Sequence, residues 1–107
     1  MKLPRAKDYP KTINVKDEVY QVRLVARIPG EDRTVEGMCD DGAKIIWIRK
    51  DQSPRGLMRT FIHELAHALD GEYSIRLRHA QVYRLEEALE AFLTDNFIAD
   101  NMFVRRQ

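Results

Sequence analysis

The chain has little of what several protein classes require. It carries a single cysteine, Cys39, so it cannot form an internal disulfide, and a small secreted domain would usually contain several pairs. No apolar run approaches the roughly 20 residues that a membrane-spanning helix needs. The N-terminal stretch "MKLPRAKDYPKT" has basic residues but no apolar segment after them, so it does not read as a secretory signal. These absences predict a cytoplasmic protein without a membrane partner.

Net charge is also nearly absent. The formal charge is +1, so the overall balance does not favour a nucleic-acid partner or an anionic membrane. Apolar residues make up 44% of the 107-residue chain and charged residues 33%, which is typical of a globular protein rather than a disordered one. A chain of this length has room for one modest core. We therefore expect residues 1–107 to form a single domain.

The first half of the sequence is patterned like a β-sheet. "TINV" and "EVYQVRLVARI" read as strands, and in the second run apolar residues alternate with mostly polar ones. "TVEGMC" and "AKIIWIR" follow, joined at Asp41-Gly42, a dipeptide typical of tight hairpins whose central residues have positive φ. "AKIIWIR" is apolar on both faces, and we expect Trp47 in the core. The predicted sheet is an antiparallel meander of three main strands.

The second half is patterned like two helices. Ser53 is a suitable N-cap, Pro54 suits the first helical position, and Gly71 is a candidate left-handed cap. A second helix is expected from about His79 to the region of Asp100. Its predicted apolar stripe contains Val82, Leu85, Leu89, Phe92 and Asn96, widened by Tyr83, Leu93 and Phe97. The fold class is therefore α+β, with the sheet followed by two helices.

Two of only three histidines lie within the first of these helices, in "FIHELAHALD". Residues four apart on a helix are offset by about 40° and one turn, so His63 and His67 project side by side and can bind one metal ion. Glu64, about 100° round from His63, can instead reach a water held on the metal. Imidazole suits Zn²⁺ better than Mg²⁺ or Ca²⁺. The pattern predicts a zinc site with Glu64 as the catalytic base.

A catalytic zinc ion needs a third protein ligand, and the second helix offers candidates. Glu86 and Glu90 each lie about 20° from His79 on the helix, on opposite sides, whereas Glu87 lies about 80° away. For Glu87 and Glu90 the alternative is an ordinary solvated face. His79 and Glu86 are roughly 10 Å apart along the axis, so only one of them can bind the metal directly. The residues alone leave both open. If His79 is the ligand, Glu86 could accept the free ring N–H of a metal-bound histidine.

The stretch from Gly37 to Asn96 resembles the zincin metallopeptidases, in particular small phage and bacterial proteins of the SprT-like group. The similarity rests on the strand "KIIWIR", the helix "TFIHELAHALD" and the segment "HAQVYRLEEALEAFLTDN". In SprT-like proteins the third zinc ligand is a histidine that begins a His-x-x-x-aromatic pattern, and "HAQVY", His79 to Tyr83, matches it. The resemblance implies a zincin-like fold in which the strand from Lys44 to Arg49 pairs with an extended peptide.

A rival resemblance concerns the gluzincins, whose third ligand is a glutamate about eighteen residues beyond the second histidine. Glu86 fits that spacing, and "EEALEAF" is similar to the glutamate helix of ImmA/IrrE-type peptidases. We favour His79, because imidazole completes a ligand set that zinc accepts readily. With one cysteine the chain lacks the separate zinc ribbon of longer SprT-like proteins, which argues against nucleic-acid targeting.

The expected function is hydrolysis of a protein or peptide by a zinc-dependent peptidase. His63, His67 and His79 would hold Zn²⁺, Glu64 would activate water, and Tyr83 is a weaker candidate for stabilising the oxyanion. The alternative is a non-catalytic, zinc-stabilised phage or prophage interaction domain, because a metal can supply stability that a small core lacks. The presence of Glu64 favours catalysis, since a structural site needs ligands and no base.

Overall fold

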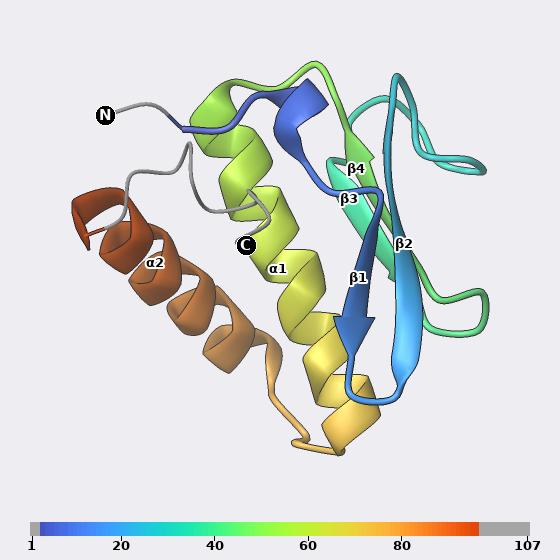
Figure 1. Cartoon of the computed structure of the whole chain (residues 1–107), viewed down its shortest axis with the longest axis vertical. Helices are drawn as coiled ribbons and strands as arrows, with labels where there is room; N and C mark the ends of the chain where they lie inside the picture. The colour runs from blue at the N-terminus through green and yellow to red at the C-terminus, as the bar shows by residue number, and fades with distance from the viewer. Residues whose placement is uncertain (1–2, 97–107) are drawn as a thin grey trace, which may run out of the picture.

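The computed structural model describes residues 3–96 and consists of a sheet followed by two long helices (Figure 1). A short 3-10 helix, η1, spans Ala6–Asp8. The four strands are β1 (Thr12–Val15), β2 (Glu18–Val25), β3 (Gly37–Asp40) and β4 (Ile45–Arg49). The helices are α1 (Pro54–Tyr73) and α2 (His79–Asn96). The predicted α+β class, with the sheet before the two helices, is confirmed. The predicted end of the second helix near Asp100 lies outside the described residues.

The strand order of the sheet is β1-β2-β4-β3. The two outer pairs, β1 with β2 and β3 with β4, are antiparallel, but the central pair of β2 with β4 is parallel. The prediction of an antiparallel meander of three main strands is therefore wrong: the sheet of the described residues has four strands, and its central pair is parallel. The chain between Val25 and Ile45 is long enough to cross over, which parallel neighbours require, and it places β3 at the outer edge on the way.

The hairpin between β3 and β4 is present, but its turn differs from the predicted one. The turn covers residues 41–44, and the left-handed residue in it is Lys44, with φ of 58°, rather than Asp41 or Gly42. A four-residue turn needs only one such residue at its end, whereas the predicted two-residue turn would need two. The polar side chain of Asp40 supports this turn by accepting a hydrogen bond from the Ala43 N–H at 3.0 Å.

The core lies between one face of the sheet and α1. Ile46 and Ile48 of β4 are fully buried against the helix, whereas Ile45 and Trp47 on the other face are only partly buried. The guanidinium of Arg23 lies 5.5 Å from the Trp47 ring centroid, so this tryptophan is not in the core as expected. Each fully buried aliphatic side chain contributes about 1.5–3 kcal/mol, so the helix-facing side of the sheet stabilises the position of α1.

Helix α1 begins where the sequence predicts. The Ser53 side-chain oxygen accepts a hydrogen bond from the Gly56 N–H at 3.0 Å, and Pro54 is the first helical residue. The helix continues beyond Gly71 to Tyr73, and the left-handed cap is Ser74, with φ of 54°. The prediction of Gly71 as the cap is wrong, because Gly71 remains helical beside the carboxylate of Asp41. The Asp70 carbonyl accepts the N–H of Ser74 and so satisfies the helix end.

Helix α2 packs on α1 with a face that the sequence pattern does not predict. Between His79 and Leu93, the part of α2 whose side chains the structure describes, the buried residues are Val82, Glu86 and Glu90, with exposed fractions of 1%, 8% and 3%. Glu90 therefore does not lie on a solvated face. The remaining described large apolar residues of the predicted stripe are exposed or only partly buried: Tyr83, Leu85, Leu89, Phe92 and Leu93. Phe97 lies outside the described residues. Apart from Val82, the described residues of the predicted stripe therefore do not form the buried face of α2, because α1 presents the basic side chains of Arg55 and Arg59 to this helix. No helix within residues 3–96 is both long and apolar enough to cross a membrane.

Candidate metal and catalytic site

The two histidines of the motif converge on one point. His63 and His67 lie one turn apart on α1, and their Nε2 atoms are 3.2 Å apart. Two imidazole nitrogens that each lie about 2.0–2.1 Å from one tetrahedral zinc ion would be separated by about 3.3–3.4 Å. The spacing of the two nitrogens therefore fits two neighbouring vertices of such a site. Burial, the nearby His63 and the nearby His79 lower the pKa of His67, which favours the neutral form that binds metals.

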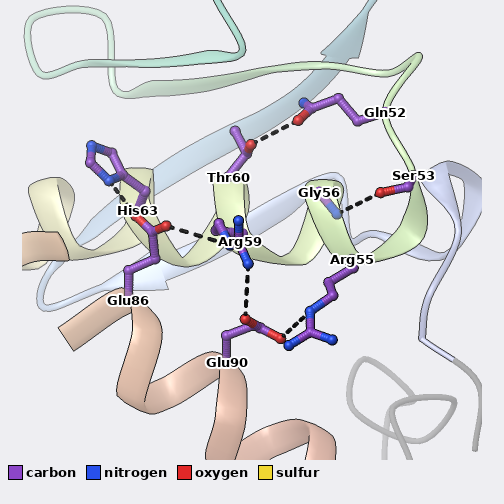
Figure 2. A network of polar contacts seen from close by, with 9 residues as sticks. All are labelled: Gln52, Ser53, Arg55, Gly56, Arg59, Thr60, His63, Glu86 and Glu90. Atoms are coloured by element: carbon purple, nitrogen blue, oxygen red, sulfur yellow. Dashed lines mark hydrogen bonds and ion pairs between the residues drawn. The ribbon is translucent and has the colours of Figure 1, made fainter. Parts of the chain in front are cut away.

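A glutamate of α2 contacts the opposite side of the His63 ring. Glu86 Oε1 lies 2.6 Å from His63 Nδ1, and Glu86 is 8% exposed (Figure 2). An ionised carboxylate only accepts hydrogen bonds, so the ring must donate from Nδ1. In the neutral imidazole this leaves the lone pair on Nε2, the atom that faces His67. The expected contact between Glu86 and a motif histidine is present.

Glu64 is a buried carboxylate held between α1 and β3. It is 7% exposed, and burial raises its pKa to about 7; the charge of Glu86 adds to this rise while His63 opposes it. Gly37 of β3 makes this packing possible. A Cβ at Gly37 would lie 2.5 Å from Thr60 Cγ2 and 3.1 Å from Glu64 Oε2. Sequence reasoning missed Gly37, although a glycine within a strand is a signal of close backbone approach.

His79 and Tyr83 lie on the first turns of α2, facing the motif. The ring centroid of His79 is 6.0 Å from that of His67, and the Tyr83 centroid is 5.1 Å from that of His63. Tyr83 is 57% exposed, so it lies at the rim of the site. Within residues 3–96, no three His, Cys, Asp or Glu side chains are close enough together to hold an ion as they stand. The site thus has a convergent pair of histidines, with the third histidine on the adjacent helix.

Two adjoining hollows meet at the motif and share Gly37, His63 and Glu64. One, of about 210 Å³, extends toward α2 and is also lined by Glu36, Arg59, Thr60, Tyr83 and Glu86. The other, of about 410 Å³, extends along β3 and is also lined by Met38, Cys39, Asp41, His67, Asp70 and Gly71. Together they leave space on both sides of the Glu64 carboxylate. A chain-like ligand could therefore lie across the motif.

The strand beside these hollows is β3 rather than β4. β4 is paired on both sides, with β2 and with β3, so the strand from Lys44 to Arg49 has no free edge for a peptide (Figure 1). That expectation is wrong. β3 is the edge strand, and the Arg49 N–H donates to the Glu36 carbonyl at 2.8 Å. Because antiparallel pairing alternates, Gly37 and Cys39 direct their backbone N–H and C=O groups away from β4.

No family model, curated protein or solved structure matches this chain. The similarity to SprT-like zincins therefore remains a proposal. The residues that indicate the chemistry of the site most directly are His63, Glu64 and His67.

Proposed function

We propose that this protein is a small zinc-dependent peptidase of the SprT-like type that acts on protein or peptide substrates in the cytoplasm. The observation that carries the proposal is the 3.2 Å separation of the His63 and His67 Nε2 atoms beside the buried carboxylate of Glu64. Two converging imidazoles account for metal binding. A carboxylate next to them, which a purely structural site would not need, accounts for catalysis.

His63, His67 and His79 would hold the metal. Zinc bound there would supply Lewis acidity and lower the pKa of its water. His79 is favoured over Glu86, because Glu86 already accepts a hydrogen bond from the His63 Nδ1–H at 2.6 Å. To act as a ligand beside Nε2, Glu86 would have to leave that contact. His79 lies at the start of α2, its side chain is exposed, and its ring centroid is 6.0 Å from that of His67.

Glu64 would act as the general base and then as the general acid. Its carboxylate accepts a proton from the attacking water and passes it to the leaving amine as the peptide bond breaks. In the metal-free chain, burial raises the pKa of this carboxyl group, which makes it a stronger base than an exposed glutamate. Tyr83, at the rim of the site, would donate a hydrogen bond to the oxyanion that forms on the substrate.

The edge of β3 would position the substrate. An extended peptide that adds to this edge would bond to the outward N–H and C=O groups of Gly37 and Cys39. Gly37 and Glu64 line the same two hollows, so a peptide bound along Gly37 would run past the proposed base. Main-chain pairing depends little on the sequence of the substrate, which favours unfolded or extended protein segments.

The activity test compares Glu64→Gln with Glu87→Gln. Glu87 is an exposed glutamate of α2, so its variant controls for the loss of one negative charge. Zinc-loaded wild type and Glu87→Gln should cleave a denatured protein or a peptide library, and a chelator should abolish this cleavage. Glu64→Gln should bind zinc and fold, but lose at least about 100-fold in rate, the range expected for general-base catalysis.

Absence of cleavage by zinc-loaded wild type would contradict the peptidase proposal and favour the zinc-stabilised interaction domain. The identity of the third ligand is tested separately by measuring bound zinc. His79→Ala should lose most of its metal, whereas Glu86→Gln should retain a weakened site. The reverse result would make Glu86 the third ligand.

A further inference from the structure

The contact between the two helices is a polar ladder formed by Arg55, Arg59 and His63 on α1 with Glu86 and Glu90 on α2 (Figure 2). The three α1 residues are spaced four apart, as are the two glutamates, so each set lies along one helix face. Arg55 Nε lies 2.9 Å from Glu90 Oε2, and Arg59 Nη2 lies 3.5 Å from Glu90 Oε1. The ladder continues from Arg59 to Glu86 and ends on the His63 ring.

Apolar packing alone does not explain why α2 faces this way. Leu85 and Leu89 are each 38% exposed, whereas Glu86 and Glu90 of the same helix are buried. Burying an ion pair is weak evidence for stability, because removing charges from water offsets much of their attraction. A helix that buries carboxylates and exposes leucines loses hydrophobic stabilisation. We infer that the ion pairs with Arg55 and Arg59 determine which face of α2 lies against α1.

The last contact of the polar ladder is the one between Glu86 and His63. We propose that Glu86 is a positioning residue that keeps the His63 proton on Nδ1 and the Nε2 lone pair directed toward His67, and that Arg59 and Glu90 hold Glu86 there. The effect of this positioning on zinc binding rests on the proposed function. The position of the proton on the His63 ring is a property of the metal-free chain and can be measured in the absence of zinc.

The geometry supports each part of this role. Glu86 Oε1 is 2.6 Å from His63 Nδ1, whereas its second oxygen, Oε2, lies 3.8 Å from Arg59 Nε. The arginine therefore attracts the carboxylate without occupying the oxygen that contacts the ring. Arg59 also lies between Glu86 and Glu90, where its positive charge offsets the repulsion between two carboxylates one helical turn apart.

The first test is the tautomer of His63 in the metal-free full-length protein, read from the ¹⁵N chemical shifts of its ring at a pH where histidine is neutral. Wild type and Glu87→Ala should show a protonated Nδ1 and an unprotonated Nε2. Glu86→Ala, or Glu86→Gln should the alanine variant not fold, should show a mixture of tautomers. A proton on Nε2 in wild type, or an unchanged tautomer in the folded Glu86 variant, would overturn the proposal.

The second test is zinc affinity, measured by competition with a chelator of known strength. Loss of a carboxylate that orients a metal-bound histidine typically weakens binding about 10–100-fold, so Glu86→Gln should fall in this range. Glu87→Gln should stay within about twofold of wild type. An unchanged affinity for Glu86→Gln would contradict the positioning role. If wild type binds no zinc at all, the proposed function fails, while the tautomer measurement still decides whether Glu86 positions His63.

Discussion

Replacing Gly37 by alanine tests the close packing of β3 against the motif helix. The new methyl group would lie 2.5 Å from Thr60 Cγ2, a distance at which one group must move. Thr60 is not free to rotate away, because its hydroxyl donates to Gln52 Oε1 at 3.0 Å. The backbone carbonyl of Trp47, 3.1 Å from the same position, restricts movement on the other side. The methyl group can be accommodated only if β3 shifts away from α1.

Overpacking of this kind costs about 1–3 kcal/mol. Replacing glycine by alanine also restricts the unfolded chain, which offsets up to about 1 kcal/mol. We therefore expect Gly37→Ala to lower the free energy of unfolding by about 1–2 kcal/mol, or the melting temperature by roughly 5–15 °C for a domain of this size. The assay is thermal unfolding followed by circular dichroism.

Gly42→Ala is the matched control. A Cβ at Gly42 would meet only Asp40 Oδ1 at 3.5 Å, an ordinary contact. Its melting temperature should stay at or slightly above that of wild type. If Gly37→Ala is as stable as Gly42→Ala, β3 does not lie against Thr60 and Glu64 as described, and the reasoning about the edge strand fails with it.

Three further predictions concern stability. Ser53→Ala removes the N-cap of α1 and should lower the free energy of unfolding, measured by chemical denaturation, by about 1 kcal/mol. An unchanged free energy would mean that this cap is not formed. Hydrogen bonds, first from Lys44 and then from Tyr20, lower the pKa of Glu72 below its ordinary 4.5. The ionised form of Glu72 therefore stabilises the fold at neutral pH. This stabilisation is lost as the pH falls through the lowered pKa. Glu72→Gln should therefore flatten the acid side of a plot of melting temperature against pH, and a parallel curve would refute this. Val82→Ala should lower the free energy of unfolding by about 2 kcal/mol but Leu89→Ala by less than about 1 kcal/mol, because their exposed fractions are 1% and 38%. The reverse order would show that α2 packs on α1 through Leu89 rather than through Val82.

The elements that the sequence predicts well are those determined by local signals. The start of α1 follows from Ser53 and Pro54, whose roles depend only on the next few residues. The start of α2 at His79 and the hairpin between β3 and β4 were also predictable. The convergence of His63 and His67 follows from helix geometry alone, because residues four apart share one face.

Features that depend on distant partners were not predictable in this way. Glu86 and Glu90 are buried because Arg55 and Arg59, about thirty residues earlier, face them across the helix pair. The hydrophobic periodicity of α2 depends only on the residues of that helix, so it cannot indicate these partners and favours burial of the apolar stripe instead. The same reasoning applies to the sheet: alternation along β2 is equally compatible with parallel and antiparallel neighbours.

The candidate site likewise combines features that follow from local sequence with features that depend on distant partners. The motif itself can be read from the sequence, and a contact of Glu86 with one of the histidines is one of the two roles that the sequence suggests for that glutamate. Only the structure shows that this histidine is His63. The approach of Gly37 to Glu64 was not predictable, because a strand glycine indicates that something lies close without indicating what. The choice of β4 as the peptide-pairing strand failed because strand order is a tertiary property.

The most direct test of the central claim is zinc X-ray absorption on the protein loaded with one equivalent of zinc, compared with His63→Ala and His67→Ala. We predict zinc–nitrogen distances of about 2.0–2.1 Å in wild type, with imidazole scattering that is lost or reduced in each variant. A spectrum without imidazole ligands, or one that is identical in wild type and both variants, would contradict the account.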